Sequence, residues 1–192
     1  EGELALLRTP EQGVLSLAAS TIPGEYLLPG LLAAFRNRYP HVTVQMTILD
    51  TAGVATRLLD READVGVMGA VVERPGLHHE RLVGDKIVLA VPPDHEFARR
   101  ERVPIENLSG QSFVLREEGS GTRQTVETAL AAVGFRLAPD RVALTLGSTQ
   151  AILQAVAQGL GLGFVSARAA HQPRIAGQVG CVDLEGVDLG RD

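Results

Sequence analysis

The chain has 192 residues, enough for one substantial domain or two small lobes, and its content of 45% hydrophobic and 21% charged residues is typical of a globular protein. Its net charge of −5 argues against a nucleic-acid-binding surface on this chain, because DNA binding requires a basic patch. No apolar run approaches membrane-spanning length, and the single cysteine, Cys181, excludes an internal disulfide, which fits a reducing compartment.

The first half of the chain alternates predicted strands and helices. A charged segment broken by Pro10 comes first, and a turn at residues 21–24 then starts a leucine-rich helix that stops before Pro40. Strict alternation predicts a half-buried strand at Val42–Leu49, and the short apolar run Asp64–Met68 predicts a buried parallel strand. With a strand at residues 14–20 and a helix at about 52–62, the expected order is β-α-β-α-β.

The second half repeats the alternation after Pro75-Gly76 interrupts it. Residues 77–85 lead into a strand at Ile87–Val91 that ends in a proline-rich turn. Two successive α/β lobes with short apolar strands are therefore predicted. The remaining expected elements are strands at 112–115, 142–146, 162–165 and 179–184, and helices near 104–108, at 121–133 and after Ser148.

The segment from Arg116 to Val133 contains the most informative helix start. Its second half carries an apolar stripe at helical spacing, and Gly134 provides a left-handed stop. If Ser120 is the N-cap, the amides that follow are unpaired donors, and an anion gains about 1.5–3 kcal/mol from such a hydrogen bond and about 0.3–1 from the helix dipole. The segment therefore predicts a small-anion site at Ser120, Gly121, Thr122 and Arg123.

An ordinary capped helix is the alternative, because Ser-Gly-Thr is good capping chemistry anywhere. A Walker A loop is excluded, since the only lysine is Lys86. A nucleophile elbow is also excluded, since Glu118 and Thr122 occupy the positions where glycines would flank Ser120.

Four predicted strand-to-helix turns are rich in hydroxyl groups. Ligands of open α/β sheets bind beyond the carboxyl ends of the strands, so four such turns favour a cleft between the lobes that is lined by neutral donors, although each turn alone is more often a cap. The turns contain Ser20-Thr21, Thr51, Ser120 with Thr122, and Ser148-Thr149.

Catalytic and metal-binding chemistry has little support. Asp50 and the group Asp94-His95-Glu96 are polar, but no nucleophile–base pair accompanies them. The other histidines have no metal-ligand spacing. We therefore expect no enzyme activity, no catalytic residues, no metal and no cofactor.

The chain resembles the effector-binding domain of LysR-type transcriptional regulators nearly from end to end. This resemblance implies an α/β, two-lobed fold like that of type-2 periplasmic binding proteins, with crossover hinge strands. It also implies that residues 1–12 are a linker end, 14–85 lobe I and 86–188 lobe II, with a winged helix-turn-helix before the linker and the completion of lobe I after residue 192. The segments that carry it are VLSLAAST, EYLLPGLLAAFRNRYPHVTVQM, ADVGVMG, DKIVLAVPPDHEFA, REEGSGTR and LGSTQAILQAVAQGLGLGFVS.

By position, the resemblance assigns effector contacts to both lobes. Lobe I contributes Ser20, Thr21 and Thr51, and lobe II contributes Ser120, Gly121, Thr122, Arg123, Ser148 and Thr149. The implied function is a cytoplasmic ligand-sensing domain whose lobes close on a small anion: a sulfur oxyanion, a small carboxylate or a sugar phosphate.

The resemblance also implies partners. Family domains pair side by side as homodimers, which form tetramers at full length, and they reach DNA through the N-terminal domain. The leucine-rich helix around Leu27–Phe35 is the candidate surface for pairing. The alternative function is a periplasmic solute-binding protein of the same fold.

Overall fold

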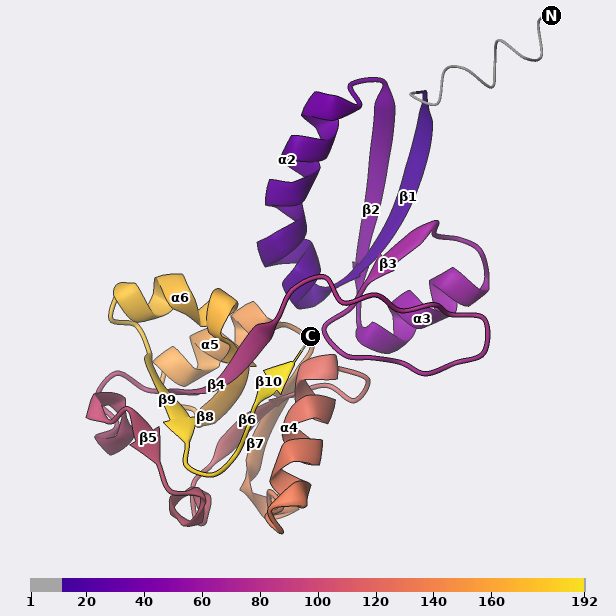
Figure 1. Ribbon diagram of the computed structural model, residues 1–192. Coiled ribbons are helices and arrows are strands. Elements are labelled where there is room, and N and C mark those ends of the chain that lie inside the picture. Colours follow the sequence, from indigo (N-terminus) through magenta and orange to yellow (C-terminus); the bar gives the residue numbers. More distant parts are fainter. Residues whose placement is uncertain (1–11, 192) are drawn as a thin grey trace, which may run out of the picture. The chain divides into compact units, whose positions relative to one another are not determined.

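The computed structural model describes residues 12–191, which form two compact units (Figure 1). Unit 1 runs to Met68 and includes Val72–Leu77, while unit 2 contains Gly69–Val71 and all described residues from His78. The expected linker end at residues 1–12 lies outside the described residues apart from Gln12. Within unit 2, a 3.1 Å hydrogen bond from Arg168 Nη2 to the Gly84 carbonyl joins the segment before Asp85 to α6 (Ala167–Ile175).

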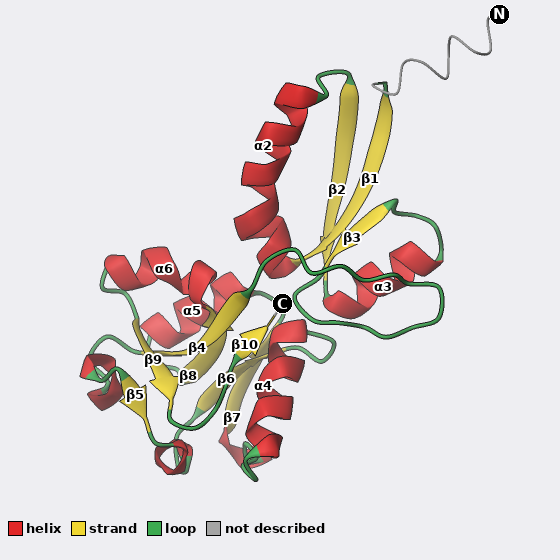
Figure 2. Cartoon of the chain, in the orientation of Figure 1, coloured by secondary structure: helices red, strands yellow, loops and turns green. Residues whose placement is uncertain are grey.

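Unit 1 is a parallel sheet with helices, and its strands follow the order β2-β1-β3 (Figure 2). β1 and β2 pair in register over their whole length, from Gly13 with Val42 to Ser20 with Leu49. The predicted order is confirmed. The elements are β1 (Gly13–Ser20), a π-helical turn η1 (Pro23–Leu27), α2 (Leu28–Arg38), β2 (Val42–Leu49), α3 (Thr51–Leu59) and β3 (Val65–Val67).

The prediction that β3 is a buried strand is wrong. Val65 is 46% exposed, because β3 lies at the edge of the described sheet and pairs only with β1 there. Gly66 explains how α3 still packs against β3, since a Cβ at Gly66 would lie 2.5 Å from Leu58 Cδ1.

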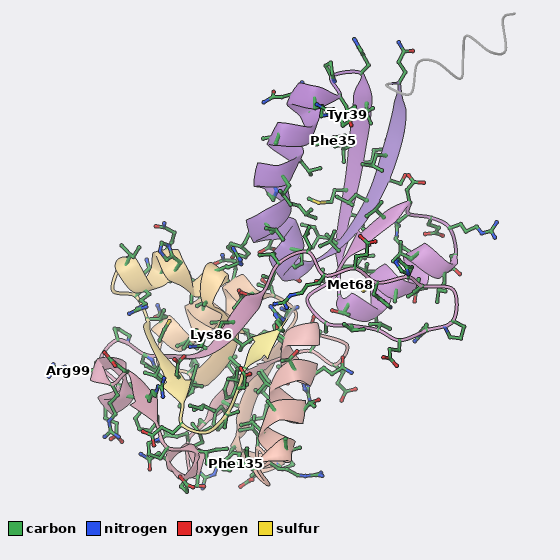
Figure 3. The ribbon with its side chains drawn as sticks, viewed as in Figure 1. Phe35, Tyr39, Met68, Lys86, Arg99 and Phe135 are labelled. Carbon is green, nitrogen blue, oxygen red and sulfur yellow. The ribbon has the colours of Figure 1, made fainter. Side chains whose placement is uncertain are left out.

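Helix α2 covers little of its own apolar surface within the described chain. Leu28 is its only buried residue, whereas Leu31 is 45% exposed. Phe35 and Tyr39 lie together at its C-terminal end, with ring centroids 4.9 Å apart (Figure 3). The helix therefore presents apolar side chains to its surroundings, as the leucine-rich pattern indicates.

Unit 2 contains a mixed sheet with the strand order β5-β9-β4-β8-β6-β7, and β10 pairs with β4 beside this path. Its strands are β4 (Asp85–Val91), β5 (Arg102–Val103), β6 (Phe113–Arg116), β7 (Val142–Leu146), β8 (Leu162–Ser166), β9 (Gly180–Leu184) and β10 (Gly190–Arg191). Its helices are α4 (Gly121–Ala132), α5 (Thr149–Ala157) and α6 (Ala167–Ile175), with 3₁₀ turns η2 (Glu96–Arg99), η3 (Ile105–Leu108) and η4 (Pro139–Arg141).

The strands and the two longest helices predicted for unit 2 are confirmed, but the pattern missed α6, the short strands β5 and β10, and the 3₁₀ turns η2 and η4. Helix α6 contains Pro173 and has alanines as its only buried residues, so it lacks a strong apolar stripe. β5 and β10 have two residues each, which is too short to show an alternating pattern of apolar and polar residues. The expected helix near 104–108 is the 3₁₀ turn η3.

The core of unit 2 forms where β4 crosses the middle of the sheet. Ile87, Leu89 and Val91 are fully buried, and the Phe113 and Phe164 rings stack with centroids 6.2 Å apart. The N-termini of α4, α5 and α6 follow strands of this packed sheet.

Candidate functional site

One edge of the unit 2 sheet carries the ligand-binding turns predicted for lobe II. Strands β6, β7 and β8 run parallel, so their carboxyl ends, and the starts of α4, α5 and α6 that follow them, share that edge. β4 is antiparallel to β8, and β10 is antiparallel to β4. The first residue of β4, Asp85, and the last of β10, Arg191, are therefore brought to the same edge.

Helix α4 begins as predicted. The Ser120 side chain accepts from the Arg123 amide at 3.5 Å, and Gly119 before it has φ of +86°, which favours glycine. Ser120, Gly121 and Thr122 are all buried. The predicted stop is also confirmed, because Gly134 adopts φ of +76° just after α4.

Helix α5 begins in the same way after β7. Ser148 is its N-cap and accepts from the Ala151 amide at 3.4 Å, and Thr149, its first residue, is only 2% exposed. The structure thus brings all six residues predicted for lobe II to the N-termini of two helices that follow the adjacent strands β6 and β7.

Arg116, the last residue of β6, connects these two helix starts. Its side chain is 5% exposed, and its Nε and Nη2 each donate to Glu117 at 2.7 Å, while Nη1 donates to Thr149 Oγ1 at 2.8 Å. Its carbonyl accepts from Arg123 Nη1 at 3.1 Å. Arg116 therefore holds the first turns of α4 and α5 to the end of one strand.

Arg191 repeats this arrangement at Thr122. Its Nε and Nη2 donate to Asp85 Oδ2 at 3.1 and 2.8 Å, and its Nη1 donates to Thr122 Oγ1 at 2.9 Å. The Arg191 and Asp85 side chains are 5% and 12% exposed. Gly69 leaves room for the guanidinium, since a Cβ there would lie 3.2 Å from Arg191 Cζ.

Arg123, the cation predicted for the site, already has partners inside unit 2. Its Nε donates to Glu127 at 2.7 Å, in addition to the Nη1 contact with the Arg116 carbonyl. An anion bound through this guanidinium would share it with those two groups.

Glu117 remains ionised beside Arg116. Burial by itself raises the pKa of this carboxyl, but the hydrogen bonds from Arg116 and from the Glu117 backbone, with the charges of Arg116 and Arg123, outweigh burial and lower the pKa below its ordinary value. Arg116 and Glu117 therefore form an ion pair that is held by two hydrogen bonds.

The residues predicted for lobe I share an edge of the unit 1 sheet. Ser20 ends β1 opposite Leu49, and Thr51 is the first residue of α3, so both lie at the carboxyl ends of parallel strands. Ser20 and Thr51 are buried, and Thr21 follows Ser20. Asp50 caps α3 by accepting from the Gly53 amide at 2.6 Å.

Hollows formed by the described residues of unit 2 include one of about 670 Å³, called the larger hollow below, which none of the predicted residues lines. It is lined by Arg81, Gly84, Asp85, Lys86, Ala167, Arg168, Asp188, Gly190 and Arg191. Thr122 and Arg123 line a smaller one beside α4. Arg191 links the larger hollow to Thr122.

Sequence reasoning missed Asp85, Arg116, Glu117 and Arg191 as members of the site. Arg116 and Glu117 directly precede the predicted anion segment, which is the one signal that could have singled them out. Nothing local marks Asp85 and Arg191, since their contact joins residues 106 positions apart.

Residues 12–191 were also compared with what metal binding and membrane spanning require. This range holds no group of three or more histidine, cysteine or acidic side chains arranged to bind a metal ion. None of its helices combines the length and apolar character needed to cross a bilayer.

A family model described as the LysR substrate binding domain matches residues 8–192. A relative from Anaeromyxobacter dehalogenans (strain 2CP-C), named phosphonates import ATP-binding protein PhnC, is 38% identical over 93% of this chain and 36% of its own length. The HTH-type transcriptional regulator CbbR of Xanthobacter flavus is 33% identical over 100% of this chain and 57% of its own. The chain thus spans about a third to three fifths of the length of these curated relatives.

Among solved structures, the regulatory domain of CcmR from Synechocystis PCC6803, in complex with 2-PG, is similar to this chain. It is 28% identical, has a TM-score of 0.81, and the match covers 94% of this chain and 85% of that one.

Proposed function

Because the chain belongs to the family of the LysR substrate binding domain, with its two-lobed fold of the type-2 periplasmic binding proteins, we propose that it senses a small anion for a LysR-type transcriptional regulator. One observation supports an anionic ligand. Two helix N-termini that bear buried hydroxyl groups, Ser120 and Thr122 on α4 and Thr149 on α5, meet at one edge of unit 2. Helix N-termini attract negative charge through their free amides and their dipole.

The ligand classes remain those expected from the sequence: a sulfur oxyanion, a small carboxylate or a sugar phosphate. The solved CcmR regulatory domain in complex with 2-PG supports a compact anionic ligand for this chain too. In this proposal Ser20, Thr21 and Thr51 of unit 1 supply the remaining contacts. The domain acts by binding and carries out no reaction.

For the binding signal to reach the rest of the regulator, binding must favour one arrangement of the two lobes over another. We place the pairing surface of a homodimer on α2, whose Leu31 is 45% exposed. In the full-length regulator, tetramers in the cytoplasm would then reach DNA through an N-terminal domain.

A periplasmic solute-binding protein is the competing function. Relatives named as transcriptional regulators, including CbbR and the CysL of Bacillus subtilis, support the regulator instead. Sequencing the parent gene separates the two, because a helix-turn-helix upstream excludes the transport role.

The function is tested by a thermal-shift panel of sulfite, sulfate, thiosulfate, 2-PG and muconate, with sodium chloride at equal ionic strength as the control. A ligand that binds only the folded state stabilises it by about 2.7 kcal/mol at a hundred times its Kd. We expect at least one anion to raise the Tm by several degrees above the chloride control. A panel in which every anion matches chloride contradicts the proposal.

A further inference from the structure

Beyond the effector site proposed above, we propose that the larger hollow of unit 2 binds a second ligand, an organic anion that carries phosphate. Arg81, Arg168 and Arg191, which line the hollow, contact the phosphate. This second site is built from charged side chains, whereas the proposed effector site is built from hydroxyl groups and the amides of helix starts.

The larger hollow lies where the first residues of β4 and the last residues of β10 run side by side. Gly190 pairs with Lys86 and Arg191 with Asp85, and the first two residues of α6 also line the hollow. Gly84 and Gly190 have no side chain that could fill it. All of its lining residues belong to unit 2, so the hollow is a feature of that unit alone.

Positive charge exceeds negative charge around the hollow, although the chain as a whole carries −5. The lining contains four basic side chains and two carboxylates. Lys86 also pairs at 2.6 Å with Asp183, a carboxylate that does not line the hollow. Even with Asp183 included, four cations are present against three carboxylates. An anion that enters is therefore attracted, and this attraction should weaken as salt is added.

Arg191 is a cation built into the wall of the hollow. Its side chain is 5% exposed, and three of its five N–H groups donate, two of them to Asp85 and one to Thr122. The other two N–H groups take no part in these bonds. A phosphate oxygen in the hollow can accept from them, and such charge-assisted hydrogen bonds are among the strong ones.

Arg168 is a second cation of the wall and has more freedom to move. Its side chain is 40% exposed, its Nη2 donates to the Gly84 carbonyl at 3.1 Å, and its Nε lies 3.7 Å from Asp85 Oδ1. A guanidinium can bind one phosphate group through two parallel hydrogen bonds. Because a phosphate group has three acceptor oxygens and nearly two charges, several arginines can bind it together, which favours phosphate over a single carboxylate.

The size of the hollow indicates an organic ligand. Its volume of about 670 Å³ falls within the range of roughly 300–1,000 Å³ that is typical of sites for small organic molecules. A lone sulfate or phosphate ion would leave most of this space unfilled. We therefore infer a phosphorylated organic molecule, and pyrophosphate is a simple probe of its charged part.

The test is titration calorimetry with pyrophosphate in magnesium-free buffer at low, constant ionic strength. Wild-type protein should bind, and Arg81→Gln/Arg168→Gln, which changes two exposed side chains, should bind about tenfold or more weakly. The matched control Arg99→Gln/Arg136→Gln removes the same charge from exposed positions of unit 2 outside the hollow and should keep wild-type affinity. Wild-type protein that does not bind, or equal losses in the two double variants, overturns the inference.

A gain of affinity provides a second test that misfolding cannot imitate. Asp188→Asn removes one negative charge from the lining and keeps a side-chain oxygen that can accept from the Gly190 amide, as Asp188 Oδ1 does at 2.8 Å. Pyrophosphate should then bind about two- to fivefold more tightly. Asp94→Asn, at an exposed position outside the hollow, should change nothing. Unchanged or weaker binding by Asp188→Asn overturns the inference, and so does an equal gain in Asp94→Asn.

A final variant separates this site from the proposed effector site. Ser20→Ala/Thr149→Val removes one predicted effector contact from each lobe, and neither residue lines the hollow. Its affinity for pyrophosphate should equal that of wild type. A tenfold loss in this variant overturns the inference, because pyrophosphate then occupies the effector site, and the proposed function is left standing.

Discussion

At the scale of single residues, the helix caps follow from local chemistry. Ser120, Ser148 and Asp50 each accept from an amide in the helix they begin, as their position before an apolar stripe predicts. The contacts of Arg116 and Arg191 with the two helix starts do not follow from local chemistry. Arg116 reaches Thr149 and Arg191 reaches Thr122 only after the sheet has formed, and buried arginines have no sequence signature.

The Glu117–Arg116 pair makes a prediction about pH. The folded-state pKa of Glu117 is lowered, so its contribution to stability is present above its unfolded pKa of about 4.3 and is lost as the pH falls through the folded value. Urea unfolding should show Glu117→Gln less stable than wild type at pH 7, by about 1–3 kcal/mol, because Arg116 loses its partner. The two curves should converge below pH 4. Parallel curves from pH 7 to pH 3 would contradict the pairing.

At the scale of elements, periodicity predicts those strands and helices that bury an apolar face. β4 and α5 are found because buried apolar side chains recur along them. The exposure of β3 was mispredicted because an edge position depends on strand order, which a short apolar run does not reveal. Helix α6 was missed because alanines, its only buried residues, form a weak stripe.

Packing of α5 on β8 can be tested at Gly163. A Cβ there would lie 2.6 Å from Ile152 Cγ2 and 3.1 Å from Val156 Cγ2, so Gly163→Ala should force the helix off the strand. We expect a loss of about 1–3 kcal/mol in the free energy of unfolding. Gly30→Ala in α2 is the matched control, because a Cβ there meets nothing within 4 Å, and it should be neutral or stabilising. Equal effects of the two changes would refute close packing at Gly163.

At the scale of the whole molecule, the family and its fold could be identified from sequence because quoted segments along nearly the whole chain match the family pattern together. The effector cannot be identified in this way. Hydroxyls and amides at helix starts recognise any compact acceptor, so the residue types at the site do not single out one anion.

Pairing of two chains through α2 is tested by Leu31→Arg. Leu31 is 45% exposed, so the change should leave the fold intact, with a Tm within a few degrees of wild type. A buried charge at a self-complementary surface should weaken a dimer by about tenfold or more in sedimentation experiments. Ala34→Arg, on the same helix and also exposed, maps the width of the surface. A wild-type dimer constant in both variants would place the pairing surface elsewhere.

We propose that one small anion is held by hydroxyls from both lobes. The most direct measurement is calorimetry with the anion that most raises the Tm, on wild type, Thr122→Ala and Ser20→Ala. Each change removes one charge-assisted hydrogen bond, so each should cost about 1.5–3 kcal/mol, or roughly a tenfold to hundredfold loss of affinity. The two losses should be non-additive if either change alone prevents closure. Wild-type affinity in both variants would contradict the account.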